Sequence, residues 1–574
     1  MANRIPPELW SHIFDIAADE DVIFFPGLPT KMSQSSWYKH VAGRWKLRTP
    51  QDAINIIQRR SYFTKKSIIR TCKSWHRLGV EFLVRCLFFD NPRKLSNLRS
   101  ILARDPKLGW WTRRLHVTRF SAGAGRGGSA SGMDAFEEPL IDIIARCPNI
   151  EIFVVDLPMS HSFGPIADTL GNFCHKLRTV HWHVPLAQLP KVIWALESLP
   201  QLISVHLDFD GSEILALTRA NNGQSRGRSG ESSPARSMLS PGNELVPLGA
   251  AQDIGLTLPS LQQLSLSGHC QAFLEQAAGW SLPMLRSFSF DFKLHSEDVP
   301  DVTVFLQAHG SDLLFLDLNC IPSLDVRTIL DLCPQLHTFG FNPDWKISSN
   351  PNPTVDDEED EEDDEDDDPT LPAALTRRPH PNITNIGLHG LMYAFGVGVA
   401  AAFASRDPLG SMLTQRANDR NFSALTKANF PKLQLIRVLS TSVLEDLERA
   451  DGPGERGGYE RWEKWWDKCS RMGVKLEDCT GAPLGTLPQD PQQTHPGRET
   501  SEDLASDEEW EYEDYEEYEE EGGGAPAQGS DKVGIEELRE LLEECRQLWE
   551  EKDDPPVFGP MVLINGQQGP APFR

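Results

Sequence analysis

Hydrophobic residues recur in one pattern along most of the chain after residue 147. An apolar residue is followed by others three and five positions later, and Pro often stands two positions before the first. The alternation at the end of each copy predicts a short β-strand that buries one face. Nine copies occur, at 147–155, 174–182, 199–207, 258–266, 282–290, 311–318, 333–341, 380–388 and 430–438.

The spacing of these copies predicts the architecture. Five of the gaps between their first apolar positions are 23 to 28 residues, and helical patterns such as 138–146 and 189–196 lie between predicted strands. A strand and a helix repeated at this period resemble a leucine-rich-repeat solenoid, here a degenerate one because the Asn or Cys position is irregular. The expected fold is therefore α/β over residues 91–481, with disordered insertions at about 220–242 and 350–370.

In each predicted strand, the residue between the last two apolar positions should lie on the inner face of the sheet, away from the helices. A protein substrate is one occupant of such a face, and solvent is the alternative for any single residue. The polar candidates for substrate binding are His181, His206, Asp317 and Arg437. The full row is Val154, His181, His206, Ser265, Ser289, Asp317, Gly340, Gly387 and Arg437.

The first 90 residues carry a different, helical pattern. An apolar stripe predicts a helix from about residue 7 to 18, and two further apolar segments follow at 64–79 and 80–89. The insertion at 22–62 ends in a Thr-Pro start and an apolar stripe, which predict an additional packed helix over 49–62. These elements indicate a small helical module that docks on another surface.

Two segments of this module resemble an F-box. RIPPELWSHIF at 4–14 is similar to its opening, and CKSW at 72–75 is similar to its later part. F-box proteins with degenerate leucine-rich repeats are common in basidiomycete fungi. The resemblance implies binding to a Skp-type adaptor of a cullin-RING ubiquitin ligase through Ile5, Pro6, Glu8, Leu9, Ile13, Phe14, Cys72, Trp75 and Leu78. The alternative is that these helices cap the solenoid.

The charge of the chain is concentrated in two tracts. The net charge is −27, but 356–368 is an unbroken acidic run and 502–521 is acidic without Lys or Arg. Basic residues are more frequent than acidic ones in the first 120 residues, yet they are scattered and match no nucleic-acid-binding motif. We therefore expect no nucleic-acid partner.

The cysteines and the apolar segments bear on the compartment. The 10 cysteines include no C-x-x-C pair, and no signal-peptide pattern precedes the first helix. Reduced thiols in the cytoplasm or nucleus are expected. The apolar stretch 390–404 is shorter than the roughly 20 residues of a spanning helix, so it predicts a buried helix and no membrane association.

Motifs for catalysis are nearly absent. The segment 123–128 fits G-x-G-x-x-G after a predicted strand at 115–120, but more residues follow before the next helix than the dinucleotide site allows, and Asp156 lies too far along. No metal-ligand or nucleophile motif occurs. We predict no enzymatic activity, no cofactor and no metal, and retain a nucleotide-dependent enzyme as a distant alternative.

The last part of the chain is expected to contain little folded structure. The segment 459–481 should close the solenoid with a Trp-rich helix and a short strand. After it we expect a disordered acidic linker at 482–532, an amphipathic helix at 533–552 and a disordered tail at 553–574. The amphipathic helix has two open outcomes, folding back or binding another protein.

Together these patterns predict a non-catalytic substrate receptor of an SCF-type ubiquitin ligase, which acts in ubiquitin-dependent protein degradation. Its F-box-like module would span 1–90, and its repeats would hold a protein substrate of unknown identity. The alternative is a protein-interaction scaffold that does not bind the adaptor.

Overall fold

The computed structural model divides into two units, one of residues 1–36, 47–485 and 556–574 and one of residues 37–46 and 486–555. It describes residues 5–18, 20–39, 45–89, 92–118, 134–159, 162–210, 251–252, 254–291, 302–319, 325–344, 375–397, 400, 406–445 and 458–484.

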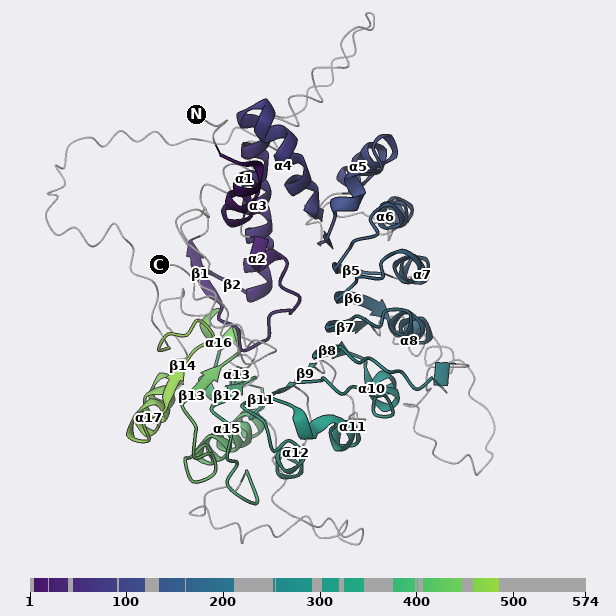
Figure 1. Cartoon of the computed structure of the whole chain (residues 1–574). Coiled ribbons are helices and arrows are strands. Elements are labelled where there is room, and N and C mark those ends of the chain that lie inside the picture. The colour runs from purple at the N-terminus through teal and green to yellow at the C-terminus, as the bar shows by residue number, and fades with distance from the viewer. Residues whose placement is uncertain are drawn as a thin grey trace, which may run out of the picture. The chain divides into compact units, whose positions relative to one another are not determined.

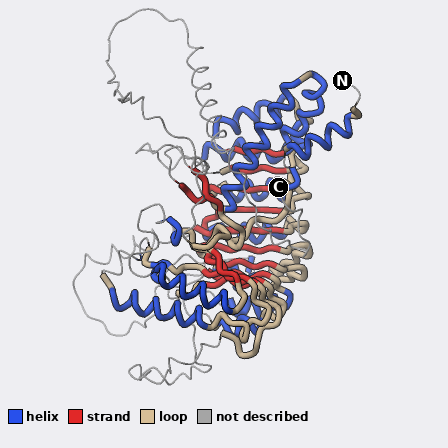
Figure 2. Tube along the Cα trace, turned by 90° about the vertical axis from the view of Figure 1, so that its left-hand side faces the viewer, coloured by secondary structure: helices blue, strands red, loops and turns tan. Residues whose placement is uncertain are grey.

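A parallel sheet of 12 strands runs through the first unit, and its strands lie side by side in chain order. Figure 2 shows them stacked in one column. The nine repeat copies coincide with β5 to β13, so these strand predictions are confirmed. The bounds are β3 Cys86–Phe89, β4 Arg114–Val117, β5 Ile152–Pro158, β6 Thr179–Pro185, β7 Ser204–Asp210, β8 Gln263–Gly268, β9 Ser287–Asp291, β10 Phe315–Asn319, β11 Thr338–Phe341, β12 Asn385–Leu388, β13 Leu435–Val438 and β14 Lys475–Glu477.

Helices alternate with the strands and lie along one face of the sheet (Figure 1). This arrangement is a solenoid-like α/β fold. The bounds are α5 Pro92–Arg104, α6 Asp134–Arg146, α7 Phe163–Phe173, α8 Leu189–Glu197, α10 Gln271–Ala277, α11 Val302–His309, α12 Val326–Leu332, α13 Met392–Phe395, α15 Pro408–Ser423, α16 Ser442–Glu445 and α17 Gly458–Arg471.

The core lies between the sheet and these helices. The apolar residues of each repeat, such as Val180 and Trp182 in β6, are completely buried there. Trp182 packs edge-on against Phe163 of α7, with ring centroids 5.3 Å apart. The repeated apolar triplets thus supply the surface that joins each strand to its helix.

Four helices precede the sheet: α1 Pro7–Ala17, α2 Glu20–Ile23, α3 Pro50–Thr71 and α4 Lys73–Arg85. The predicted start at Thr49 is confirmed, because its side chain and that of Asp52 form a capping box. The predicted continuous helix over 64–79 is wrong, since Cys72 is extended and separates α3 from α4. Residues 86–89, predicted as helical, form β3. Strands β1 Ser36–Lys39 and β2 Trp45–Arg48 make a separate two-stranded sheet.

Several predictions concern residues outside the described part of the chain. These are the insertions, both acidic tracts, the glycine segment 123–128 and the segments 485–574. Of 390–404, the structure describes residues 390–397 and 400, and the one helix among them is the short α13. Within the described residues, no helix combines the length and apolar character needed to cross a membrane.

Candidate functional site

The opening helix α1 has one apolar side that the described chain leaves uncovered. Leu9, Ile13 and Ile16 are 54%, 43% and 64% exposed, and Ile5 just before the helix is 38% exposed. Spacings of three and four residues place them along one side of the helix. Pro6 and Glu8, also predicted to bind the adaptor, are exposed at the start of this side.

The opposite side of α1 is packed against α3 and α4. Phe14 is 1% exposed and forms a cluster with Ile68 and Phe82, with Trp75 and Leu78 partly buried against it. Its ring lies 5.3 Å from that of Trp75 in an edge-on arrangement. Of the predicted adaptor-binding residues, Phe14, Trp75 and Leu78 therefore support the exposed side from beneath.

Cys72, another predicted adaptor-binding residue, is exposed at the junction of α3 and α4. Its Sγ accepts a hydrogen bond from the Trp75 backbone N–H at 3.4 Å and so caps α4. This contact holds the first turn of α4, where Trp75 begins to pack under α1.

A partly buried ion network fixes α1 on the other helices. The Arg85 guanidinium contacts Asp15 of α1 and Glu20 of α2, each at 2.8 Å, and Glu81 at 2.5 Å. Lys65 of α3 lies 2.7 Å from Glu20, and both side chains are buried. These residues gave no signal in the sequence because acidic and basic side chains usually remain on the surface. The network orients the exposed side of α1 relative to α3 and α4.

On the sheet, the nine predicted inner-face residues form one row, since each is paired in register with the next. We call it the second row. Two residues earlier on each strand lies the first row, which includes Arg114, Thr179, Gln263 and Phe315.

His181 and His206 lie together in the second row and are half-buried. Their ring centroids are 4.1 Å apart, and His181 Nδ1 is 3.4 Å from Asp156 Oδ1. Burial lowers the pKa of His181 to about 4, although Asp156 opposes the shift. Among the described residues, no group of three or more His, Cys, Asp and Glu side chains is placed to hold a metal ion. Neutral His181, together with His206, remains a candidate for binding a partner.

Asp317 and Arg437, both expected to face a substrate, are buried and paired within the chain. Asp317 is 3% exposed and its carboxylate lies 2.5 Å from His389 Nε2. Arg437 is 7% exposed and donates to Glu477 at 2.8 Å. Both charges are satisfied inside the chain, which is the usual condition for burying a charge.

A segment of the chain itself crosses the inner face. Residues 23–35, here called the strap, leave α2 on the side of the strands away from the helices (Figure 1). Backbone groups of the strap bond to the sheet in chain order: Ile23 O with Arg114, Pro26 O with Thr179, Leu28 N and O with Gln263, Met32 O with Arg437, and Ser35 N with Cys479 O.

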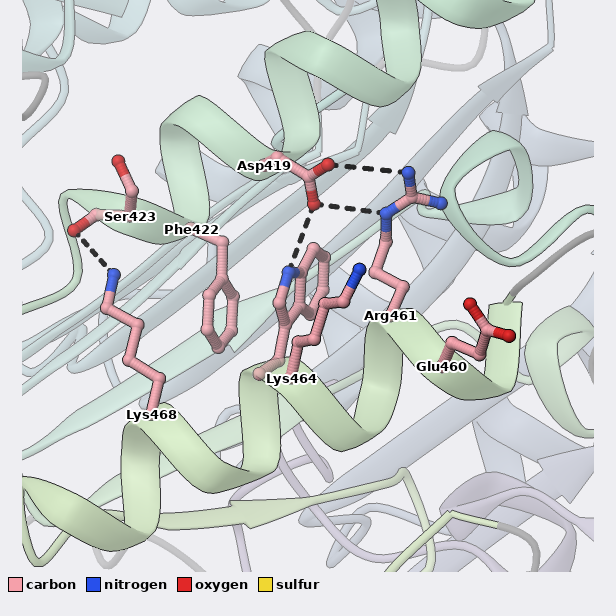
Figure 3. Close-up of a pocket in the computed structure, with 8 residues that line it drawn as sticks. Asp419, Phe422, Ser423, Glu460, Arg461, Lys464 and Lys468 are labelled. Carbon is pink, nitrogen blue, oxygen red and sulfur yellow. Dashed lines mark hydrogen bonds and ion pairs between the residues drawn. The ribbon is translucent and has the colours of Figure 1, made fainter. Parts of the chain in front are cut away.

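The segment that ends the solenoid has a pocket of about 430 Å³ between α15 and α17 (Figure 3). Its aromatic wall is Trp465 stacked on Phe422, with ring centroids 4.0 Å apart. The Arg461 guanidinium and the Trp465 indole both donate to Asp419, and Lys468 donates to the Ser423 carbonyl. These polar groups join the two helices, as the prediction that this helix closes the solenoid requires.

Comparison with known proteins gives no match, either to a protein-family model or to a curated protein. Support for a function therefore comes from the exposed side of α1 and from the inner face of the sheet.

Proposed function

We propose that this protein is the substrate-recognition subunit of an SCF-type cullin-RING ubiquitin ligase. In this proposal the helices α1, α3 and α4 are an F-box that binds a Skp-type adaptor, and the sheet belongs to degenerate leucine-rich repeats that hold a protein substrate. The chain itself performs no catalysis, because the partner ligase supplies the ubiquitin-transfer chemistry.

The observation that carries the proposal is the division of α1 into two sides. Its exposed side matches the adaptor-binding positions Ile5, Leu9 and Ile13 of the F-box resemblance, while Phe14 anchors the helix from beneath. Exposed apolar side chains grouped on one helix face are typical of a surface that a partner covers. A helix whose purpose was to cap the solenoid would instead present polar residues to solvent.

The test is capture of the full chain by purified Skp-type adaptor, with Leu9→Asp plus Ile13→Asp as the disrupting variant. Both side chains are exposed, so the variant should remain folded, and charges at the centre of a protein interface should weaken capture by at least about 100-fold. Phe14→Asp is unsuitable because it would put a charge in the core.

A matched control is Leu409→Asp plus Leu413→Asp on α15, whose side chains are 62% and 53% exposed. It introduces the same charges at a comparable exposure and should be captured like the wild type. Absence of capture for the folded wild type, or equal capture of all three proteins, would reject the adaptor and favour the scaffold alternative.

A further inference from the structure

Backbone groups of the strap bind side chains of the sheet at several points. Arg114 donates to the Ile23 carbonyl at 2.6 Å, and the Gln263 amide both donates to Leu28 O and accepts from Leu28 N, each at 3.0 Å. Thr179 donates to the Pro26 carbonyl. Any extended chain offers such groups, so these contacts do not depend on the side chains of the strap.

One strap side chain enters a specific pocket. Met32 is 6% exposed and clusters with Phe315 and Leu439. Its Sδ would lie 2.6 Å from a Cβ built on Gly387, so the absence of a side chain there makes room for it. A long unbranched apolar side chain fits this pocket.

The ends of the strap are also buried: Ile23 is 1% exposed in a cluster with Ile57 and Cys86, against which Phe24 packs, and Ser35 is 6% exposed. Residues 24–30 are half-buried and Lys31 is exposed. The strap forms no strand with the sheet. Between its buried ends, the strap is therefore attached at a few points.

The strap is shorter than the width of the flat sheet it would have to span, which shows that the sheet curves around it. Strands β4 to β13 would cover roughly 43 Å if flat, at about 4.8 Å between neighbours. Residues 23 to 32 cover about 30 Å when fully extended. The strap reaches both Arg114 and Arg437 because side chains extend toward it and the sheet is concave on this side.

We propose that the strip of the inner face beneath the strap, from Arg114 through Gln263 to the pocket beside Gly387, is a binding track for an extended peptide segment of a partner protein, and that the strap is its resident competitor. The partner segment would pair its backbone with Gln263 at one residue and place Met or a similar unbranched apolar residue four positions later. Leu28 and Met32 of the strap show this spacing.

The strap and the partner segment would compete for the same donors. A tethered segment has an effective concentration in the millimolar range, so it outcompetes a free peptide present at micromolar concentration. The track would therefore be closed in the isolated protein and open when the strap is released. This inference stands apart from adaptor binding, because it concerns only the sheet and the strap.

The experiment uses the full chain and a fluorescent peptide of residues 21–36, DVIFFPGLPTKMSQSS, measured by anisotropy. In the strap-free variant, residues 24–35 are replaced by Gly and Ser at equal length. We expect this variant to bind the peptide about 100-fold more tightly than the wild type does. A peptide carrying Met32→Ser and a strap-free protein carrying Gln263→Ala should each lose most of this binding.

A folded strap-free protein that does not bind the peptide would overturn the proposal. If that variant fails to fold, the full chain with Met32→Ser replaces it, because this change weakens the resident strap and leaves the track intact. It should bind the wild-type peptide at least about 10-fold more tightly than the wild-type chain does. Equal binding by the two chains would also overturn the proposal.

Discussion

The opening helix and the inner face of the sheet were both expected to bind proteins, but they differ in whether other parts of the chain cover them. The outer side of α1 leaves Leu9 and Ile13 uncovered, while the inner face carries the strap and pairs Asp317 and Arg437 internally. Apolar side chains exposed on one side of a firmly packed helix favour the proposal that a partner binds there. Polar residues on a repeat face give no such indication, because the same chain can satisfy them.

The largest expected effect concerns the two sides of α1. Phe14→Ala should lower the free energy of unfolding of the N-terminal helices by about 3–5 kcal/mol, because it leaves a cavity among Ile68, Phe82 and Trp75. Leu9→Ala should change it by less than about 0.5 kcal/mol. Urea unfolding followed by tryptophan fluorescence measures both, and similar losses would show that Leu9 is also covered.

The next effect concerns the internal pairing on the inner face. Arg437→Met should cost about 3 kcal/mol of stability, because it leaves the buried Glu477 carboxylate with Lys475 as its remaining partner and removes the donor to the Met32 carbonyl. The exposed residue Arg406 provides the control, and Arg406→Met should be nearly neutral. Urea unfolding of the two full-length variants measures the difference. A neutral Arg437→Met would mean that this part of the inner face is open to solvent.

A smaller effect should appear in the pH dependence of stability. His181 has a pKa of about 4 in the folded chain because of burial, against about 6.5 when unfolded. Between these values the unfolded state binds a proton that folded His181 does not, so stability falls as the pH decreases from 6.5 to 4. The neighbouring Asp156, His116, Asp208 and His183 enter this balance.

From pH 7 to pH 5 the free energy of unfolding should fall in both proteins. The fall should be about 2 kcal/mol smaller in His181→Gln than in the wild type. The measurement is the free energy of unfolding at both pH values. His12→Gln makes the same substitution at an exposed position of α1 and should follow the wild type. If His181→Gln also follows the wild type, His181 is accessible to water and this part of the row is open.

Most of the fold follows from local patterns. The apolar triplets located β5 to β13, and the segment 459–481 indicated α17 and β14. The wrong predictions concern short apolar segments whose ends are set by contacts with other elements. Cys72 interrupts a continuous helical stripe by capping α4 with its Sγ, and residues 86–89 leave α4 to pair with β4. Periodicity alone does not distinguish a short apolar strand from the end of a helix.

The sequence by itself determined which residues form strands β5 to β13, which side of these strands faces the helices, and which side of α1 is apolar. These features depend on neighbours a few positions apart. Only the tertiary structure decided that the strap lies on the inner face, that Arg437 pairs with Glu477, and that Arg85 joins three acidic residues. The strap pairs with Gln263 and Arg437 across 235 and 405 residues, a separation at which no local pattern carries the information.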